Sequence, residues 1–328
     1  MPLLLTQDDL RSFIERECFF EEVFQVIQDA LLCQQSDTLG YMSWLAFPLG
    51  QEERRFNINA LATPTDGTSI RIYPVSGGNI RPPCNGFFAL LIDNQEGQLQ
   101  ALMATDDLSP LRTSAPVGVA CMYLAHQGAT KLAMIGSGVQ ARHHLRAISH
   151  ALPSLKSVYV FSPSEGHRRQ YAIEMSRQTG LCVEAVETAR AAVEDADIVC
   201  IAAPGREPVL ETTWVQPGTL VVSITGQGLP PDMVKRVVVP ALEGPIARPS
   251  GWDPRPVMGA TGGRTSSTIA ATLIEVMKGT ASARQQSDDI VLYEQRGTYA
   301  WDAALLRWAY HWALEHHVGT PFQLTSSR

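Results

Sequence analysis

Short apolar runs alternate with amphipathic segments through the middle of the chain, between about residues 118 and 300. The apolar run 130–136 (TKLAMIG) precedes the helix-like segment 139–152, and the apolar run 157–162 (SVYVFS) precedes the helix-like segment 165–180. The same alternation continues to the apolar run 218–225 (GTLVVSIT). Short apolar strands that alternate with helices predict right-handed βαβ units on a parallel sheet.

The flanking segments have a different pattern. Residues 1 to about 115 combine an amphipathic start, 8–32, with strand-like stretches such as 69–75 (SIRIYPV). Residues 87–104 predict a β-hairpin that turns at Asn94–Gly97. A strongly periodic apolar and aromatic segment, 300–317, predicts a last helix. This part of the chain is therefore expected to be α+β.

Composition narrows the class of protein. The chain has 328 residues, 45% apolar and 18% charged, with a net charge of −7, which fits two globular domains and argues against a nucleic-acid surface. No apolar run approaches the roughly 20 residues that span a bilayer, so no membrane partner is expected. The start MPLLLTQDDL lacks the basic region of a signal peptide, and the expected location is cytoplasmic.

The cysteines and histidines do not predict a metal site. The six cysteines are widely spaced and include no CxxC pair, so they are expected to be reduced, with Cys121 and Cys200 in the core. The eight histidines form no HExxH motif.

A glycine-containing turn follows the apolar run 131–135. The segment Gly136–Ala141 (GSGVQA) opens a predicted helix, which is the context of a dinucleotide-binding turn. Gly136 permits the tight turn, and Gly138 lets the backbone approach a pyrophosphate at the helix N-terminus. The alternative is an ordinary strand-to-helix turn.

The end of the second strand bears on the choice of cofactor. An acidic residue usually stands there when the ribose 2′-hydroxyl is bound, but this chain has Ser162. Ser162, Ser164, His167, Arg168 and Arg169 together fit a 2′-phosphate, which favours NADP over NAD. Alternatively, the two arginines form a solvated helix face.

The segment 104–125 (ATDDLSPLRTSAPVGVACMYLA), together with GSGVQA, resembles the ornithine cyclodeaminase/mu-crystallin family, and the resemblance covers about residues 60 to 320. It implies a Rossmann doubly wound parallel sheet domain plus a split α+β domain that binds substrate and dimerises. The expected boundaries are 118–301 for the Rossmann domain and 1–117 plus 302–328 for the split domain. A homodimer is therefore expected.

The resemblance also implies roles for individual residues. Arg112, in the family's LRT motif, would bind the substrate carboxylate, although an internal ion pair is the alternative. Arg71 stands where the family usually has a lysine; it keeps the charge but cannot readily release a proton, so it is expected to hold a carboxylate or phosphate. The alternative is an edge-strand arginine that faces water. Asp302 matches a family aspartate at the start of the last helix, where it would assist the site or organise the inter-domain hinge. The alternative is a purely structural acid in a helix first turn. The residues expected to contact the cofactor are Thr113, Gly136, Ser137, Gly138, Val139, Gln140, Ser162, Ser164, His167, Arg168, Arg169, Ala203 and Thr225.

Two family elements are altered. Gln227 or Gly228 stands where cyclodeaminases carry an acid/base aspartate, and nearby Asp232 is better explained as a helix-start residue. Gln295 and Arg296 replace small residues expected near the nicotinamide and the substrate.

Three functions are therefore considered. The favoured one is an NAD(P)H-dependent imine (ketimine) reductase or amino-acid dehydrogenase that acts on a small α-imino or α-amino acid, because reduction of a protonated imine needs little acid/base machinery. The alternatives are a deaminating cyclase that uses bound NAD, and a non-catalytic NADP-binding protein of the mu-crystallin kind.

Overall fold

The computed structural model describes residues 1–16, 19–33, 42–48, 54–63, 67–76, 86–203, 208–224, 229–230, 236–240, 269–295 and 299–324. The chain divides into two compact units. Of the described residues, those up to Arg112 and those from Tyr299 onward belong to the first unit, and 113–240 with 269–295 belong to the second.

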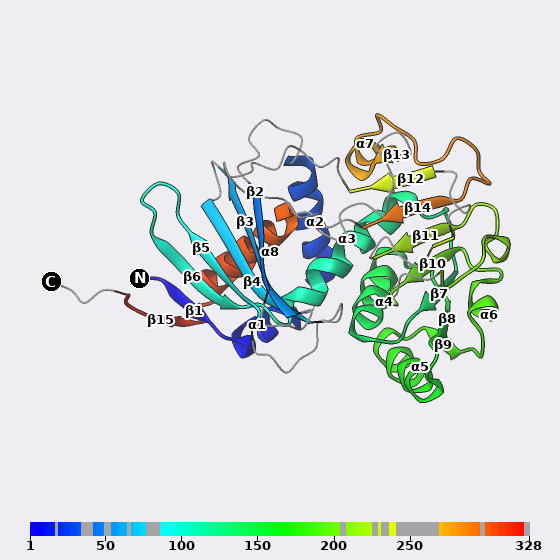
Figure 1. Ribbon diagram of the computed structural model, residues 1–328, viewed down its shortest axis with the longest axis horizontal. Helices are drawn as coiled ribbons and strands as arrows, with labels where there is room; N and C mark the ends of the chain where they lie inside the picture. Colours follow the sequence, from blue (N-terminus) through cyan, green and yellow to red (C-terminus); the bar gives the residue numbers. More distant parts are fainter. Residues whose placement is uncertain are drawn as a thin grey trace. The chain divides into compact units, whose positions relative to one another are not determined.

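The second unit is built on an eight-stranded sheet in the order β13-β12-β14-β11-β10-β7-β8-β9 (Figure 1). Every neighbouring pair is parallel, which confirms the predicted doubly wound sheet. Its strands are β7 (Lys131–Ile135), β8 (Ser157–Phe161), β9 (Cys182–Ala185), β10 (Ile198–Ile201), β11 (Leu220–Ser223), β12 (Arg236–Val239), β13 (Ile269–Thr272) and β14 (Val291–Glu294). Its helices include α4 (Val139–Ala151), α5 (Glu165–Thr179), α6 (Ala189–Val193) and α7 (Leu273–Met277).

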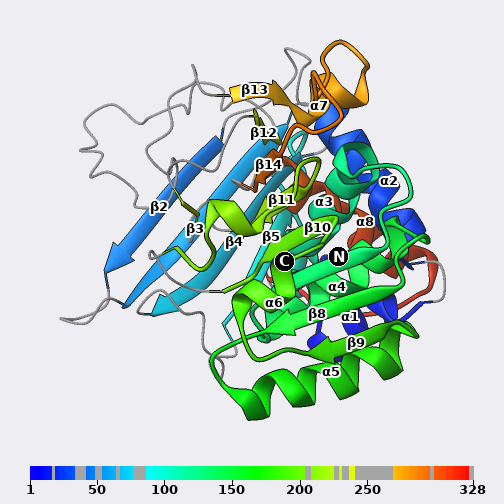
Figure 2. The same cartoon turned by 90° about the vertical axis from the view of Figure 1, so that its right-hand side faces the viewer.

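Both faces of this sheet are buried. Ala133 and Ile135 of β7 pack in one apolar cluster with Val193 of α6. Leu132 and Met134 are equally buried and, because side chains alternate along a strand, point to the opposite face. Figure 1 shows α4 and α6 on opposite sides of the sheet, and Figure 2 shows α5 beside the edge strand β9. Continuous apolar strands follow from this double coverage.

The first unit has a mixed sheet in the order β15-β1-β6-β5-β4-β3-β2. Only β1 and β6 pair in parallel. The predicted hairpin is confirmed, since β5 and β6 pair antiparallel and Asp93 N donates to Gln98 O across the turn at 2.8 Å. The strands are β1 (Leu3–Leu5), β2 (Met42–Pro48), β3 (Arg54–Thr63), β4 (Gly67–Ser76), β5 (Phe88–Ile92), β6 (Leu99–Ala104) and β15 (Thr320–Pro321).

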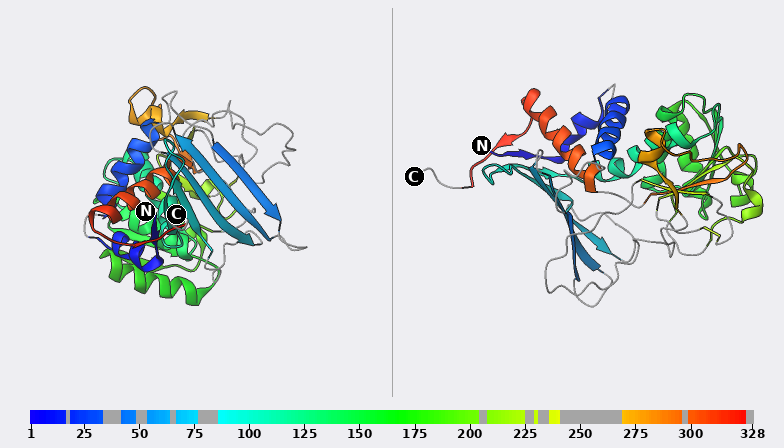
Figure 3. Two further views of the ribbon diagram at one scale, coloured as in Figure 1. Left: turned by 90° about the vertical axis from the view of Figure 1, so that its left-hand side faces the viewer. Right: turned by 90° about the horizontal axis from the view of Figure 1, so that it is seen from above.

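Helices of the first unit cover one face of this sheet. Helix α8 (Tyr299–Glu315), the predicted last helix, contacts β3, β4 and β5, and α2 (Phe19–Cys33) lies beside α8 (Figure 3). Phe13 of α1 (Gln7–Ile14) joins α8 through an edge contact with Trp308, at 4.6 Å between ring centroids. The amphipathic start of the sequence thus contains two helices, α1 and α2.

Helix α3 (Leu108–Leu124) was not predicted as a helix, and Pro116 lies inside it. Proline has no N–H, so the helical hydrogen bond to the carbonyl four residues earlier, at Arg112, cannot form. The division between the two units falls directly after Arg112. Cys121 in this helix and Cys200 in β10 are both free thiols in the core, as predicted; Cys18 and Cys84 lie outside the described residues.

Candidate functional site

Arg71 is a buried arginine in the first unit. It lies in β4, between β3 and β5, and is 4% exposed, so it does not face water from an edge strand. Its Nη2 donates to Ser109 Oγ at 2.8 Å, and its guanidinium lies 4.9 Å from the ring centroid of Tyr73. These contacts fix the side chain on the sheet face that α8 covers.

Asp302 brings the two candidate arginines together. It lies in the first turn of α8, with Oδ2 3.5 Å from Arg71 Nη1 and Oδ1 3.5 Å from Arg112 Nε. Burial lowers the pKa of Arg71, Asp302 acts in the opposite direction, and Arg112 lowers it further. Because arginine stays protonated in proteins, two cations share the Asp302 carboxylate.

A small cavity of about 10 Å³ lies against this cluster. It has room for about one water-sized group. The lining residues are Arg71, Thr105, Leu108, Arg112, Asp302, Leu305 and Leu306. Thr105 was missed by the sequence analysis. Its backbone N–H donates to Phe87 O at 2.7 Å, but its hydroxyl is buried and has no hydrogen-bond partner in the described part of the chain.

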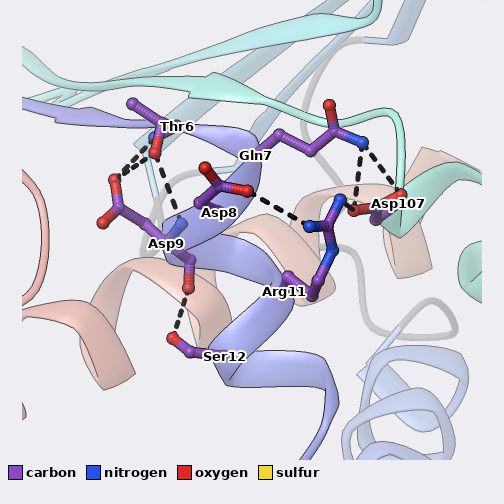
Figure 4. A network of polar contacts seen from close by, with 7 residues as sticks. All are labelled: Thr6, Gln7, Asp8, Asp9, Arg11, Ser12 and Asp107. Carbon is purple, nitrogen blue, oxygen red and sulfur yellow. Dashed lines mark hydrogen bonds and ion pairs between the residues drawn. The ribbon is translucent and has the colours of Figure 1, made fainter.

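A polar network supports the turn between β6 and α3, which carries Thr105 (Figure 4). Gln7 Nε2 lies 3.2 Å from both carboxylate oxygens of Asp107, and Arg11 Nη2 lies 3.6 Å from Oδ2 of the same residue. Thr6 and Asp9 form a capping box at the start of α1, which sets the position of Gln7 in its first turn. The N-terminal helix thereby holds the turn on which α3 begins.

Two asparagines next to Arg71 were also missed. Asn57 and Asn59 of β3 are 5% and 6% exposed, and Asn59 stands directly opposite Arg71 in the β3–β4 pairing. Asn59 Nδ2 donates to the Tyr73 hydroxyl at 3.2 Å. The signal was present in the sequence as the alternation in RFNINALA, where asparagine occupies two positions on one face of a strand.

The glycine turn of the second unit joins β7 to α4. Gly136 has φ +118°, a region that favours glycine, and a Cβ there would stand 2.7 Å from the carbonyl oxygen of Ala202 after β10. Gly138 is the N-cap of α4 and makes no side-chain cap. A Cβ on Gly138 would meet nothing within 4 Å. The side-chain position of Gly138 is therefore open, which fits the close approach of a pyrophosphate to the N-terminus of α4.

Two serine hydroxyls connect the glycine turn to the end of β8. Ser137 Oγ and Ser162 Oγ lie 2.8 Å apart. Arg168 Nη1 donates to the Ser162 carbonyl at 3.2 Å, which keeps this guanidinium at the strand end. Ser164 caps α5 by accepting from His167 N. Arg169 turns outward and pairs with Glu165 at 2.7 Å, as a solvated helix face would.

Arg142, which the sequence analysis missed, also holds this turn. Its Nη1 donates to the Ser137 carbonyl, and its Nη2 lies 3.1 Å from Glu174 Oε2 of α5. The position of Arg142 in the first turn after GSGVQA is a signal that could have identified it. Together these residues fit the phosphates and ribose of a dinucleotide, since helix-start amides, hydroxyls and guanidinium groups lie at the carboxyl ends of β7 and β8.

The other expected site residues lie in the second unit or outside the described residues. Gln295, directly after β14, is 6% exposed and donates through Nε2 to the Thr113 carbonyl at 2.6 Å. Ala203, half-buried, follows β10 at the same sheet edge as Gly136. Val139 is 58% exposed at the start of α4. The remaining predicted residues, Thr225, Gln227, Gly228, Asp232 and Arg296, lie outside the described residues.

The described residues contain neither a metal-binding cluster nor a membrane-spanning helix. Within them, no group of three or more His, Cys, Asp and Glu side chains could hold a metal ion. No helix in the same ranges is long and apolar enough to cross a bilayer.

Comparison with known proteins gives a consistent assignment. Residues 52–317 match the model of the ornithine cyclodeaminase/mu-crystallin family. The chain is 26% identical over 239 residues to the Δ1-pyrroline-2-carboxylate reductase of Bacillus cereus, covering 71% of this chain and 73% of that protein.

Solved structures agree with this match. The Δ1-pyrroline-2-carboxylate reductase of Thermococcus litoralis, in complex with NADH and L-proline, is 26% identical with a TM-score of 0.84, covering 98% of this chain and all (100%) of that chain. An archaeal alanine dehydrogenase dimer with bound NAD shares the fold at a TM-score of 0.82 and 20% identity, with 99% of each chain covered. The chain belongs to the ornithine cyclodeaminase/mu-crystallin family.

Proposed function

We propose that the protein is an NAD(P)H-dependent imine reductase or amino-acid dehydrogenase that acts at the CH–NH group of a small α-imino or α-amino acid. One observation carries the proposal: Arg71 and Arg112 share the single carboxylate of Asp302 beside a cavity. Two neighbouring guanidinium groups are suited to a carboxylate, which a guanidinium binds through two hydrogen bonds. The matched reductase with bound L-proline and NADH supports the same chemistry.

The chain's own residues bind and orient the substrate. Arg112, with 24% of its side chain exposed, is the more accessible guanidinium, while Arg71 adds charge from the buried side and Asp302 holds both in place. The bound cofactor supplies or accepts the hydride at the α-carbon. A protonated imine that gains a hydride becomes the amine directly, so no arginine has to release a proton.

We further propose that NADP is the preferred cofactor. Ser162 offers no carboxylate to a ribose 2′-hydroxyl. The guanidinium of Arg168 donates to the Ser162 and Pro163 carbonyls and so brings a positive charge to the end of β8. A fluorescence titration with NADPH and NADH tests this. We expect Arg168→Ala to weaken the binding of NADPH at least 10-fold and the binding of NADH less than 2-fold. Ser162→Asp should make the protein bind NADH more tightly than NADPH. Equal affinities in the wild type would contradict it.

The reaction itself is tested with purified protein, NADPH and a panel of imines. The panel contains cyclic ketimine carboxylates and 2-oxo acids mixed with ammonia, and oxidation of NADPH is followed at its absorbance band. We expect turnover with an imine that carries an α-carboxylate and none with the matching imine that lacks it. NADPH binding without turnover on the whole panel would overturn the proposal.

We also propose a homodimer formed through the sheet of the first unit. Ile70, Ile72 and Phe88 lie on the face opposite to the buried positions of their strands, and Phe88 is 37% exposed. An apolar sheet face of this kind is suited to a subunit interface, and the archaeal alanine dehydrogenase of the same fold is a dimer. Sedimentation should give about twice 35.8 kDa, and a single species of 35.8 kDa would contradict the dimer.

A further inference from the structure

The buried face of the first unit's sheet is polar where apolar residues are expected. Asn57, Asn59, Ser69 and Arg71 all lie on this face and are less than 10% exposed. A strand face packed against a helix is normally apolar. Ser69 and Arg71 alternate along β4, and the two asparagines alternate along β3 beside them. The polar positions therefore form one patch around Arg71.

The asparagine side chains in this patch have unused acceptors. Asn57 Oδ1 and Asn59 Oδ1 are both buried and make no hydrogen bond with the described residues. The bond from Asn59 Nδ2 to Tyr73 leaves the carbonyl oxygen as the free end of that amide. A buried carbonyl without a donor is costly and needs an explanation, such as a ligand that donates to it. Two of them side by side point to a ligand with hydrogen-bond donors.

The position of Asn59 limits the size of that ligand group. Asn59 and Arg71 are directly paired across β3 and β4, and their Cβ atoms are therefore about 5 Å apart. A substrate whose carboxylate lies against Arg71 has its α-carbon next to this pair. Only a short side chain is then needed to reach the Asn59 oxygen.

Charge limits the chemistry of the donor. Arg71 is buried, and Arg112 is a second guanidinium at the same Asp302 carboxylate. A cationic side chain on the substrate would be repelled at this distance. A hydroxyl or a carboxamide donates without adding positive charge.

We propose that the substrate carries a short, uncharged side chain that donates a hydrogen bond to Asn59, with Asn57 as a second acceptor. The proposal deepens the proposed function and rests on it for the position of the carboxylate. Asn59 is in this view a specificity-determining residue.

The test compares ligands of equal size. L-Serine and L-2-aminobutyrate differ only in a hydroxyl for a methyl group, and their binding to the NADP⁺-saturated protein is measured by calorimetry. We expect serine to bind at least 10-fold more tightly. Asn59→Leu should abolish this preference by weakening the binding of serine, while the affinity for L-2-aminobutyrate stays within 2-fold of the wild-type value. Equal binding of the two ligands by the wild type, or binding of neither, would overturn the proposal.

Turnover separates this proposal from the proposed function. 3-Hydroxypyruvate and 2-oxobutanoate, each with ammonia and NADPH, give the same pair of amino acids by reductive amination. Turnover of both at equal kcat/KM would leave the reductase standing and overturn the role of Asn59. A 10-fold preference for serine in binding, without any turnover, would retain the asparagine site and overturn the reductase.

A control separates specificity from folding. Thr219 is another buried polar residue, 2% exposed, but its hydroxyl donates to Ala196 O at 3.1 Å. Thr219→Val should lower Tm and leave the serine preference unchanged. Asn59→Leu must still bind NADPH as the wild type does, because the dinucleotide turn lies in the other unit. If the variant fails this check, Asn57→Leu replaces it. We then expect a reduced preference for serine, and an unchanged preference would overturn the proposed role of the asparagines.

Discussion

Gln295 and Thr113 are 182 positions apart in the chain and are joined by a hydrogen bond of 2.6 Å from the Gln295 amide to the Thr113 carbonyl. Gln295 directly follows β14, so its long side chain holds α3 at the residue next to Arg112. A smaller residue at this position would not span the distance. Gln295, which replaces a small residue of the family, therefore connects the end of β14 to α3.

Gln295→Leu should destabilise the protein by about 1–2 kcal/mol, because it removes a donor to a carbonyl inside the fold. Urea unfolding at pH 7 measures the loss. Gln295→Glu should cost more, since a buried carboxylate would face the same carbonyl oxygen. A Leu variant as stable as the wild type would show that the hydrogen bond contributes nothing.

Arg112→Ala should reduce kcat/KM for the imine by roughly 100-fold or more, because the carboxylate loses its accessible guanidinium. Cofactor affinity should stay within a few-fold, which fluorescence titration with NADPH measures. Arg190→Ala, which removes an exposed arginine paired with Glu194, serves as the control and should change neither quantity. Equal losses of turnover and cofactor binding would mean that Arg112 supports the fold or the cofactor.

Asp302→Asn should destabilise the first unit by about 3 kcal/mol, because breaking a buried pair leaves Arg71 uncompensated. Neither arginine would then have the Asp302 carboxylate that both contact. Acetate should then stabilise the variant, as a carboxylate supplied from solution. Urea unfolding with and without 100 mM acetate, at constant ionic strength, checks this. The wild type should gain less from acetate than the variant does, and an equal gain would argue against an anion-binding cluster.

The sequence predicted the second unit better than the first, for a physical reason. Strands such as β7 and β10 are buried on both faces, and each apolar run has the length of one strand. Helix α3 escaped prediction because most of its residues are buried, which removes the periodic polar face. The short strands β1 and β15 are defined by pairing with each other across the whole chain, which no local pattern reveals.

The candidate site was predictable where charge was concerned. Arg71, Arg112 and Asp302 came from a motif resemblance, and the structure brings them together in the first unit. Thr105 and Asn59 were missed because a neutral polar residue in a strand or turn is common on a surface. Only burial distinguishes them, and burial depends on helices distant in the sequence.

Acid should destabilise the protein through His143 and His144 of α4. Burial lowers the pKa of both to about 4; nearby Arg146 and Arg142 act in the same direction on His143. In the unfolded chain both imidazoles take up a proton near pH 6.5, whereas in the folded protein they stay neutral until about pH 4. The free energy of unfolding therefore falls as the pH drops from about 6.5 toward 4.

Each histidine should lower the free energy of unfolding by about 2 kcal/mol at pH 5 relative to pH 7. His144→Leu should remove its share of this loss, as measured by urea unfolding at both values. His150 is exposed on the same helix, so His150→Leu is the control and should keep the pH dependence of the wild type. An unchanged pH dependence in His144→Leu would contradict the assignment.

Thr105→Val is expected to separate binding from stability. The Thr105 hydroxyl lines the cavity beside Arg112 and has no hydrogen-bond partner in the described part of the fold, so replacing it with a methyl group should leave Tm unchanged or slightly raised. If the hydroxyl donates to the substrate carboxylate, KM should rise about 10-fold with little change in kcat, and Thr105→Ser should restore it. A lowered Tm with an unchanged KM would instead assign the hydroxyl a purely structural role.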